Sequence, residues 1–170
     1  DYQDPKVYEV FSNHDARSIP DFPYEFIQGP LCEFDAVSFS DLIKGIGMAH
    51  GSNVWNDNGE YLIKEHPLKE LISDRDDVFL SLQKYGIDRE TAYRIMVETR
   101  KGKLPWKGKY KWKSPDIKEM MDVLEQSDVP GWYVESMKKI HYLFPRANVV
   151  LYAKMAVAFA WFKVYYPEEY

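Results

Sequence analysis

Helix start and stop signals recur along most of this chain of 170 residues. In SDRDDVFLSLQKYG, Ser73 or Asp74 is placed to cap a helix N-terminus, acidic residues fill the first turn, and Gly86 follows the end. The next segment, DRETAYRIMVETRKG, repeats this order from Asp88 to Gly102. No stretch alternates apolar and polar residues as a half-buried strand does. The pattern therefore predicts an all-α fold built from short helices.

Three further segments carry similar signals. SFSDLIKGIG begins at a serine cap, and we expect that helix to end at its glycines. SPDIKEMMDVLEQ has Ser114 as the cap and Pro115 at the first helical position. In VPGWYVESMKKIHYLF, the residues spaced for one apolar helix face are Tyr133, Met137, Ile140 and Phe144.

Residues 1–37 differ from the rest because they are rich in proline, phenylalanine and tyrosine. Proline lacks a backbone donor and interrupts helices, so the prolines in this stretch exclude long ones. We expect an extended N-terminal segment that includes one short helix, packed on a single helical unit at residues 38–170. The sequence does not open with methionine, and we expect it to be a fragment of a longer chain.

Residues 140–167, IHYLFPRANVVLYAKMAVAFAWFKVYYP, combine a cationic start with a long apolar run. The run is nearly long enough to span a bilayer. Lys154 and Lys163 interrupt it, and a lysine at the centre of a membrane costs about 3 kcal/mol. We therefore expect a core helix of a soluble protein with no membrane contact, and the single cysteine of the chain fits the reducing cytoplasm.

Charge is unevenly distributed along the chain. The net charge is −5, yet residues 100–118 hold eight Lys or Arg and one acid, so this segment is +7 and the remainder is −12. Trp106, Tyr110 and Trp112 are interleaved with its lysines. Cations neutralise phosphates and aromatic faces stack on bases, so we expect the segment to bind a polyanion. The alternative is a solvated loop whose lysines keep the surface soluble.

A second cationic set lies around the start of the apolar run. Lys138 and Lys139 precede it, and Arg146 and Asn148 would add side-chain donors to the backbone N–H groups that favour an anion at a helix start. Tyr152 follows Asn148 by one turn on the same face. We expect this helix start to hold a phosphate, with the tyrosine ring beyond it. The residues alone leave open an arginine that caps its neighbours and a tyrosine packed in the core.

Other chemistries have little support in the sequence. Asp76 and Asp77 would point about 100° apart on a helix, which suits a helix start better than a metal site. The four histidines lack the spacing of zinc ligands. The single cysteine, Cys32, excludes an internal disulfide and has no activating base nearby. We therefore assign no catalytic residue, metal ligand or cofactor to this chain.

Several stretches, in this order, resemble the fingers region of the bacterial DNA polymerase III alpha subunit, PolC type, a C-family replicative DNA polymerase. They are IPDFPYEF, HGSNVW, RDDVFLSLQKYGI, AYRIMVETRKGK, DVPGWYVESMKKIHYLFPRA and YAKMAVAFAWFKVYYP. The resemblance implies an irregular multi-helix fingers domain that binds primer–template DNA and the incoming deoxynucleotide (dNTP) during replication. It also implies inactivity without the palm, whose carboxylates hold Mg²⁺ for nucleotidyl transfer.

The resemblance and the basic composition together nominate two sets of residues. The side chains expected at the incoming nucleotide are Arg75, Arg94, Lys138, Lys139, Arg146, Asn148 and Tyr152. Those expected on the DNA backbone, the last four from composition alone, are Arg100, Lys101, Lys103, Lys107, Lys109, Lys111 and Lys113. Further expected partners are other domains of the parent polymerase and replisome proteins.

Some residues depart from the family pattern. Asn148 stands where the family usually has histidine, and Val149, Val150 and Leu151 stand where it has small residues. These departures keep open an alternative function, a diverged non-catalytic helical module related to PolC that binds DNA or a protein. A stand-alone helical domain unrelated to polymerases is the third possibility.

Overall fold

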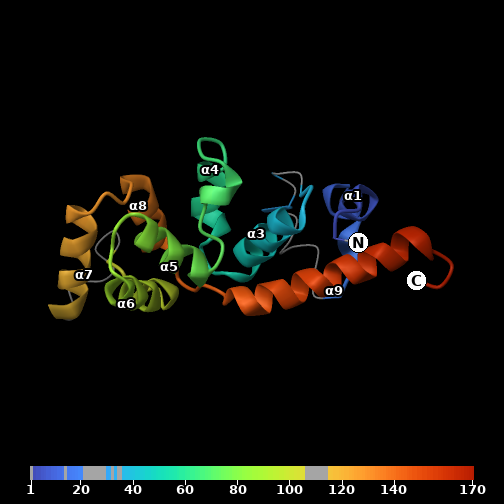
Figure 1. The fold of residues 1–170 in the computed structure, drawn as a ribbon. Helices are drawn as coiled ribbons and strands as arrows, with labels where there is room; N and C mark the ends of the chain where they lie inside the picture. Colours follow the sequence, from blue (N-terminus) through green and yellow to red (C-terminus); the bar gives the residue numbers. More distant parts are fainter. Residues whose placement is uncertain (1, 14, 21–29, 32, 34–35, 106–114) are drawn as a thin grey trace.

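The computed structural model describes residues 2–13, 15–20, 30–31, 33, 36–105 and 115–170 (Figure 1). Within these residues every regular element is helical, and the β pairing is limited to an isolated bridge between Ser52 and Tyr142. This confirms the predicted all-α fold. The elements in chain order are α1 (Pro5–Ser12), η1 (Ala16–Ser18), α3 (Phe39–His50), η2 (Trp55–Gly59), α4 (Glu60–Leu62), η3 (Leu68–Glu70), α5 (Arg75–Lys84), α6 (Arg89–Arg100), α7 (Pro115–Gln126), α8 (Gly131–Lys139) and α9 (Arg146–Tyr165).

Side-chain caps begin α5 and α6 where the sequence predicts them. The Asp74 carboxylate accepts a hydrogen bond from the backbone N–H of Asp77 at 2.9 Å, and the Asp77 carboxylate accepts from the Asp74 N–H in return. This reciprocal pair satisfies two donors that the first turn of α5 leaves without a helical partner. Asp88 accepts from the Thr91 N–H at 3.0 Å and begins α6 in the same way.

Glycines end the same two helices in a backbone conformation that other residues rarely adopt. Gly86 has a φ of 85° and Gly102 a φ of 65°. A Cβ atom at Gly102 would lie 2.8 Å from the Cα and the carbonyl oxygen of His141, whereas at Gly86 no atom lies within 4 Å. Both positions thus require positive φ, but only Gly102 is also pressed against another segment.

We expect Gly102→Ala to lower the free energy of unfolding by about 2 kcal/mol, because it adds the displacement of His141 to the cost of positive φ. Gly86→Ala is the matched control, since it carries the φ cost alone, about 1 kcal/mol. Urea denaturation of both variants measures the difference. Equal losses would show that the backbone at His141 yields freely to a methyl group.

The structure corrects the predicted end of α3. That helix continues through Gly45 and Gly47 to His50, and Gly51 follows it. The reason is tertiary: a Cβ atom at Gly47 would lie 2.7 Å from the carbonyl oxygen of Ser73. The glycine therefore permits close approach of α3 to the segment before α5, rather than stopping the helix.

The expected apolar face around α8 is also shorter than predicted. Tyr133, Met137 and Ile140 share one core, but α8 ends at Lys139 and Phe144 packs against a different set of residues. In the N-terminal segment, Asp4 caps α1 and Pro5 occupies its first turn. The described part of residues 1–37 thus contains the short helix α1, the single turn η1 and further helical residues at Pro30, Leu31 and Glu33.

Two hydrophobic cores lie along an elongated molecule (Figure 1). The first core is built by α5, α6, α7 and α8 together with residues around Trp55. The second joins α1 and α3 to α9, and it draws residues from both sides of the expected boundary at 37/38. The chain passes from the first core to the second between α8 and α9, immediately before Arg146.

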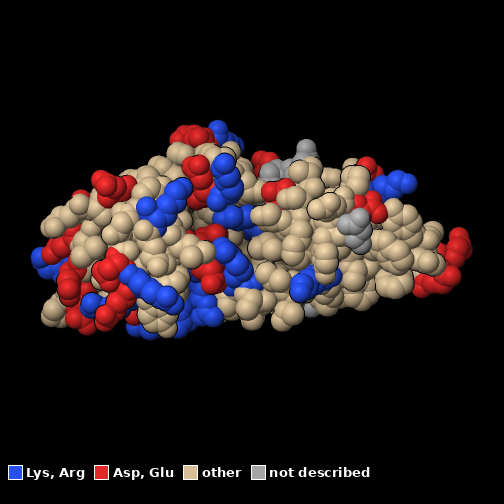
Figure 2. Space-filling model, in the orientation of Figure 1, with Lys and Arg blue, Asp and Glu red and all other residues tan. Residues whose placement is uncertain are grey.

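Helix α9 buries one face and exposes another that is also apolar. Val149, Ala153 and Ala156 are among its buried residues, while Leu151, Phe162 and Tyr165 are exposed. Figure 2 shows charged side chains gathered over the half that holds α5 to α8, and few of them along α9. By length and composition alone, α9 is apolar enough to cross a membrane, and 28% of its most apolar window is buried against the rest of the described chain.

Candidate nucleic-acid interface

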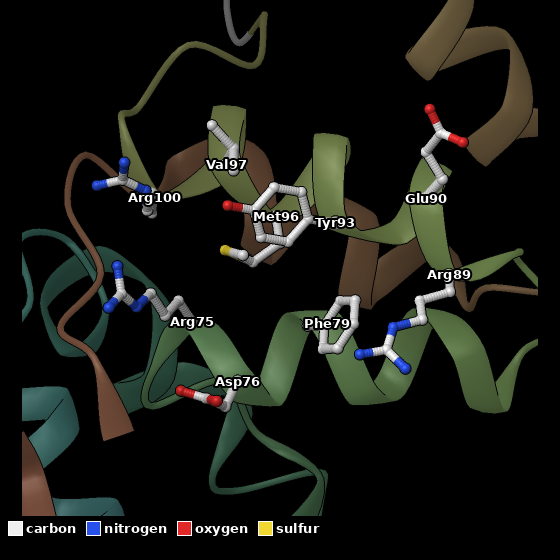
Figure 3. A pocket seen from close by; sticks show the side chains of 9 residues that line it. All are labelled: Arg75, Asp76, Phe79, Arg89, Glu90, Tyr93, Met96, Val97 and Arg100. Carbon is white, nitrogen blue, oxygen red and sulfur yellow. The ribbon is translucent and has the colours of Figure 1, made fainter. Parts of the chain in front are cut away.

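A pocket of about 680 Å³ lies between α5 and α6, which run antiparallel (Figure 3). A short turn after Lys84 reverses the chain, so the start of α5 lies beside the end of α6. The lining residues are Arg75, Asp76, Phe79, Arg89, Glu90, Tyr93, Met96, Val97 and Arg100. The pocket thus combines cationic side chains with an apolar and aromatic surface.

Three arginines line this pocket without a carboxylate partner. Arg75, Arg89 and Arg100 form no ion pair within the residues that the structure describes. The other two arginines with described side chains are paired: Arg94 with Glu119 at 3.8 Å, and Arg146 with two aspartates. The unpaired guanidinium groups are therefore concentrated at one cavity, where they remain available to an anion.

The surface between these arginines is aromatic and apolar. Phe79 from α5 and Tyr93 from α6 pack edge to face, with ring centroids 6.3 Å apart. Tyr93 is 56% exposed, so part of its ring remains free for contact. Asp76 and Glu90 also line the pocket, and the Asp76 carboxylate accepts a hydrogen bond from the Arg146 backbone N–H at 3.1 Å.

Arg146 lies beside the pocket but is held by carboxylates. Its Nε lies 3.0 Å from Asp74 Oδ2, and its Nη2 lies 2.6 Å from Asp77 Oδ1. Asp74 is fully buried, whereas the Arg146 side chain is 34% exposed. Arg146, which the sequence predicts to hold a phosphate, is therefore already neutralised by carboxylates in this structure. This arrangement agrees with the alternative of an arginine that caps its neighbours.

The pKa values of this cluster reflect burial as well as pairing. Burial and the nearby charge of Asp77 raise the pKa of Asp74, although the hydrogen bond and charge of Arg146 act against that rise. Burial lowers the pKa of Arg146, but the hydrogen bonds that it donates to Asp74 and the charges of Asp74, Asp77 and Asp76 outweigh this effect, so the net shift is upward. The Arg146 guanidinium therefore stays charged, and its charge and hydrogen bonds favour the ionised form of the buried Asp74 carboxylate.

The same cluster joins the two cores. Lys44 on α3 donates to Asp77 Oδ2 at 2.8 Å and to the Leu71 carbonyl at 2.6 Å. Asp77 lies in the first turn of α5, which belongs to the first core, while α3 and the α9 residue Arg146 lead into the second. The Asp77 carboxylate therefore receives cations from two elements of the second core, and the Asp74–Asp77–Arg146–Lys44 cluster links both halves of the molecule.

The other residues predicted at the nucleotide are spread around the molecule. Lys138 pairs with Glu135 at 2.7 Å, and Lys139 donates to the Asp57 carbonyl at 3.1 Å. Asn148 is exposed on the first turn of α9. Tyr152 is half-buried and stacks on His50, with centroids 5.1 Å apart and planes at 22°. The structure thus brings together Arg75, Arg100 and the paired Arg146, but neither lysine.

The residues predicted on the DNA backbone divide into three groups. Arg100 lines the pocket. Lys101 and Lys103 both pair with Glu98 and are exposed beyond the end of α6. The remaining predictions fall outside the described residues, and they are Lys107, Lys109, Lys111 and Lys113.

Sequence reasoning missed Arg89 and Tyr93. Their signal is present in α6 as a stripe at helical spacing: Arg89, Tyr93, Met96 or Val97, and Arg100 lie on one face. A stripe with an arginine at each end and an aromatic residue between them differs from a core face. Among the described residues, no group of three or more His, Cys, Asp or Glu is arranged to hold a metal ion.

The comparisons with known proteins agree with this architecture. Residues 1–110 match the family described as the bacterial DNA polymerase III alpha subunit finger domain. DNA polymerase III PolC-type of Clostridium perfringens is 36% identical over 98% of this chain, and those of Ureaplasma parvum and Thermotoga maritima are 41% and 37% identical over 91% and 95%. The matches cover 12%, 10% and 11% of those relatives, so the chain spans about a tenth of their length. Since the family match covers well over half of the chain, the protein belongs to the bacterial DNA polymerase III alpha subunit finger domain family, and its relatives are of PolC type.

Proposed function

We propose that this chain binds primer–template DNA and the incoming dNTP, as the fingers part of a PolC-type polymerase during cytoplasmic DNA replication. The observation that supports the DNA-binding part of this function is the concentration of Arg75, Arg89 and Arg100, all without carboxylate partners among the described residues, at one concave surface. Unpaired guanidinium groups at a cavity favour phosphate, because Arg forms paired hydrogen bonds with phosphate oxygens.

Nucleotidyl transfer itself belongs to other parts of such a polymerase. Two-metal phosphoryl transfer needs carboxylates that hold metal ions, and no group of three or more His, Cys, Asp or Glu among the described residues is arranged to hold one. We assign the Mg²⁺ ions to the palm of the parent polymerase and expect this chain alone to extend no primer. The expected partners are therefore the palm and other domains of that polymerase, replisome proteins, DNA and dNTP.

The test is binding of the chain to a fluorescent primer–template across a range of salt concentrations. With three phosphates neutralised, log K is expected to fall against log salt with a slope of about −3. Arg75→Gln, Arg89→Gln and Arg100→Gln should each reduce that slope by about one. Lys118→Gln is the control, because Lys118 is an exposed cation away from the pocket and is paired with Asp122.

Two outcomes would oppose this proposal. If the chain does not bind the primer–template even at low salt, the isolated chain has no DNA-binding function. If the three arginine variants show the same salt slope as the Lys118→Gln control, the phosphate contacts lie outside the pocket.

A second candidate function is the non-catalytic module that binds DNA or a protein. It is favoured by the engagement of Arg146 with Asp74 and Asp77, and by Leu151, which is 66% exposed on α9 near Asn148. An open reading frame that encodes a palm with paired aspartates upstream of this segment would support the polymerase function. A frame without that palm would support the module.

A further inference from the structure

We propose that the α5–α6 pocket binds an internal nucleotide of single-stranded DNA, such as the unpaired template beyond the primer end. The base would stack on Tyr93, and the phosphates on its two sides would meet arginines at the two ends of the pocket. This inference rests on the proposed function, because it specifies which part of the DNA the pocket takes.

The arrangement of the arginines is the first support. Figure 3 shows Arg75 and Arg100 together at one end of the pocket and Arg89 at the other, with Phe79, Tyr93 and Met96 between them. A free dNTP carries its phosphates on the 5′ side of its sugar only, whereas an internal nucleotide of a strand has a phosphate on both the 5′ and the 3′ side. Cations at both ends therefore match a strand.

The charge balance of the pocket gives the same result. Three arginines face two acidic residues, Asp76 and Glu90, so the lining has a small net positive charge. A triphosphate concentrates several negative charges at one end of the ligand, and the Asp76 carboxylate lies at the Arg75 end in Figure 3. Single, separated phosphates suit this lining better, since each meets one or two guanidinium groups.

The aromatic surface indicates an unpaired base. Base stacking on protein side chains needs a free face of the base, and duplex DNA covers both faces with neighbouring base pairs. Tyr93 is 56% exposed and is supported from the side by Phe79, so its ring is both accessible and held. A cavity of about 680 Å³ is within the range of pockets that enclose a ligand the size of a nucleotide.

The experiment compares three probes with the 170-residue chain: a duplex with a 5′ template overhang, a blunt duplex of the same paired sequence, and free dNTP as competitor. We expect the overhang DNA to bind about tenfold more tightly than the blunt duplex, because stacking of one base contributes an effect of this size. Tyr93→Ala should remove most of this preference. Tyr61→Ala is the matched control, since Tyr61 is 57% exposed and lies outside the pocket.

A second variant separates stacking from charge. Arg89→Gln should weaken binding of the overhang DNA and reduce its salt slope by about one, with little effect on the blunt duplex. An overhang with an abasic site at each unpaired position keeps its phosphates and loses its bases, so it should lose the stacking contribution of Tyr93 while its binding stays sensitive to Arg89→Gln. Circular dichroism of each variant confirms that the helices remain formed.

The possible outcomes distinguish this inference from the proposed function. If overhang and blunt DNA bind equally and Tyr93→Ala weakens neither, the inference is wrong, although DNA binding stands. If free dNTP competes with the overhang DNA for the pocket, one dNTP displacing one DNA molecule, the pocket is a mononucleotide site and the inference is also wrong. If neither DNA binds at low salt, both the inference and DNA binding by this chain fail.

Discussion

Arg146→Met is expected to lower the free energy of unfolding by about 3 kcal/mol, because it leaves the fully buried Asp74 carboxylate without its cation. This value is at the lower end for a broken buried pair, since the Arg146 side chain is 34% exposed and water reaches part of it. In a domain of this size, the loss corresponds to a fall in Tm of about 6–12 °C. Thermal unfolding followed by circular dichroism measures it.

The loss should depend on pH in a defined direction. The pKa of Asp74 is already raised above its ordinary value of 3.8, so the folded protein binds this proton more tightly than the unfolded chain does. The ionised carboxylate therefore opposes folding at neutral pH, and this cost is relieved as pH falls towards 4. Loss of Arg146 raises the pKa of Asp74 further, so the destabilisation should be largest at neutral pH and smaller in acid.

Two comparisons make this prediction specific. Lys118→Met removes the exposed pair with Asp122 and should leave Tm nearly unchanged, because solvent screens such pairs. Arg146→Lys should recover only part of the loss, because an ammonium group does not reproduce the forked contact with Asp74 and Asp77. A loss that is small and independent of pH would mean that Asp74 does not depend on Arg146.

Tyr133→Ala is expected to lower the free energy of unfolding by about 4 kcal/mol. The Tyr133 side chain is among the largest that the first core encloses, and its removal leaves a cavity between α8 and α5. Its hydroxyl also donates to the carbonyl oxygen of Asp77 at 3.2 Å. Burial raises the pKa of this phenol above its ordinary value, so the hydroxyl keeps its proton and remains a donor at neutral pH.

Tyr133→Phe separates the two contributions, because it keeps the ring and removes one hydrogen bond, at a cost of about 1 kcal/mol. Urea denaturation gives both values. Tyr93→Ala is the exposed counterpart and should leave the midpoint nearly unchanged, which also establishes that the pocket variant folds. A Tyr133→Ala variant that lost no more than Tyr133→Phe would mean that the core closes around the missing ring.

Local signals in the sequence were sufficient to predict much of the fold. Asp74, Asp88, Gly86 and Gly102 act within one or two turns of their own helix, and the structure places each of them in the expected role. Gly47 was misinterpreted because its role depends on Ser73, which approaches from a different segment. A glycine required by a tertiary contact and a glycine that ends a helix look alike in one sequence.

The candidate site was less predictable for the same physical reason. The sequence marked Arg146 as a phosphate ligand, but its partners Asp74 and Asp77 are about seventy positions away in the sequence. Only the packing of α9 against the start of α5 shows that they meet. Arg75 and Arg100 were nominated separately, as a nucleotide and a DNA contact, and the antiparallel course of α5 and α6 places them at one end of the same pocket.

The pocket is made entirely from one continuous hairpin, from Arg75 to Arg100. Contacts between segments so close in sequence require little loop closure, and such contacts form early and rapidly during folding. The pocket is therefore expected to assemble before the second core, which must bring α1 and α9 together from opposite ends of the chain. The proposed DNA-binding surface is thus carried by a single segment of the chain, which could be transferred into another helical scaffold in one piece.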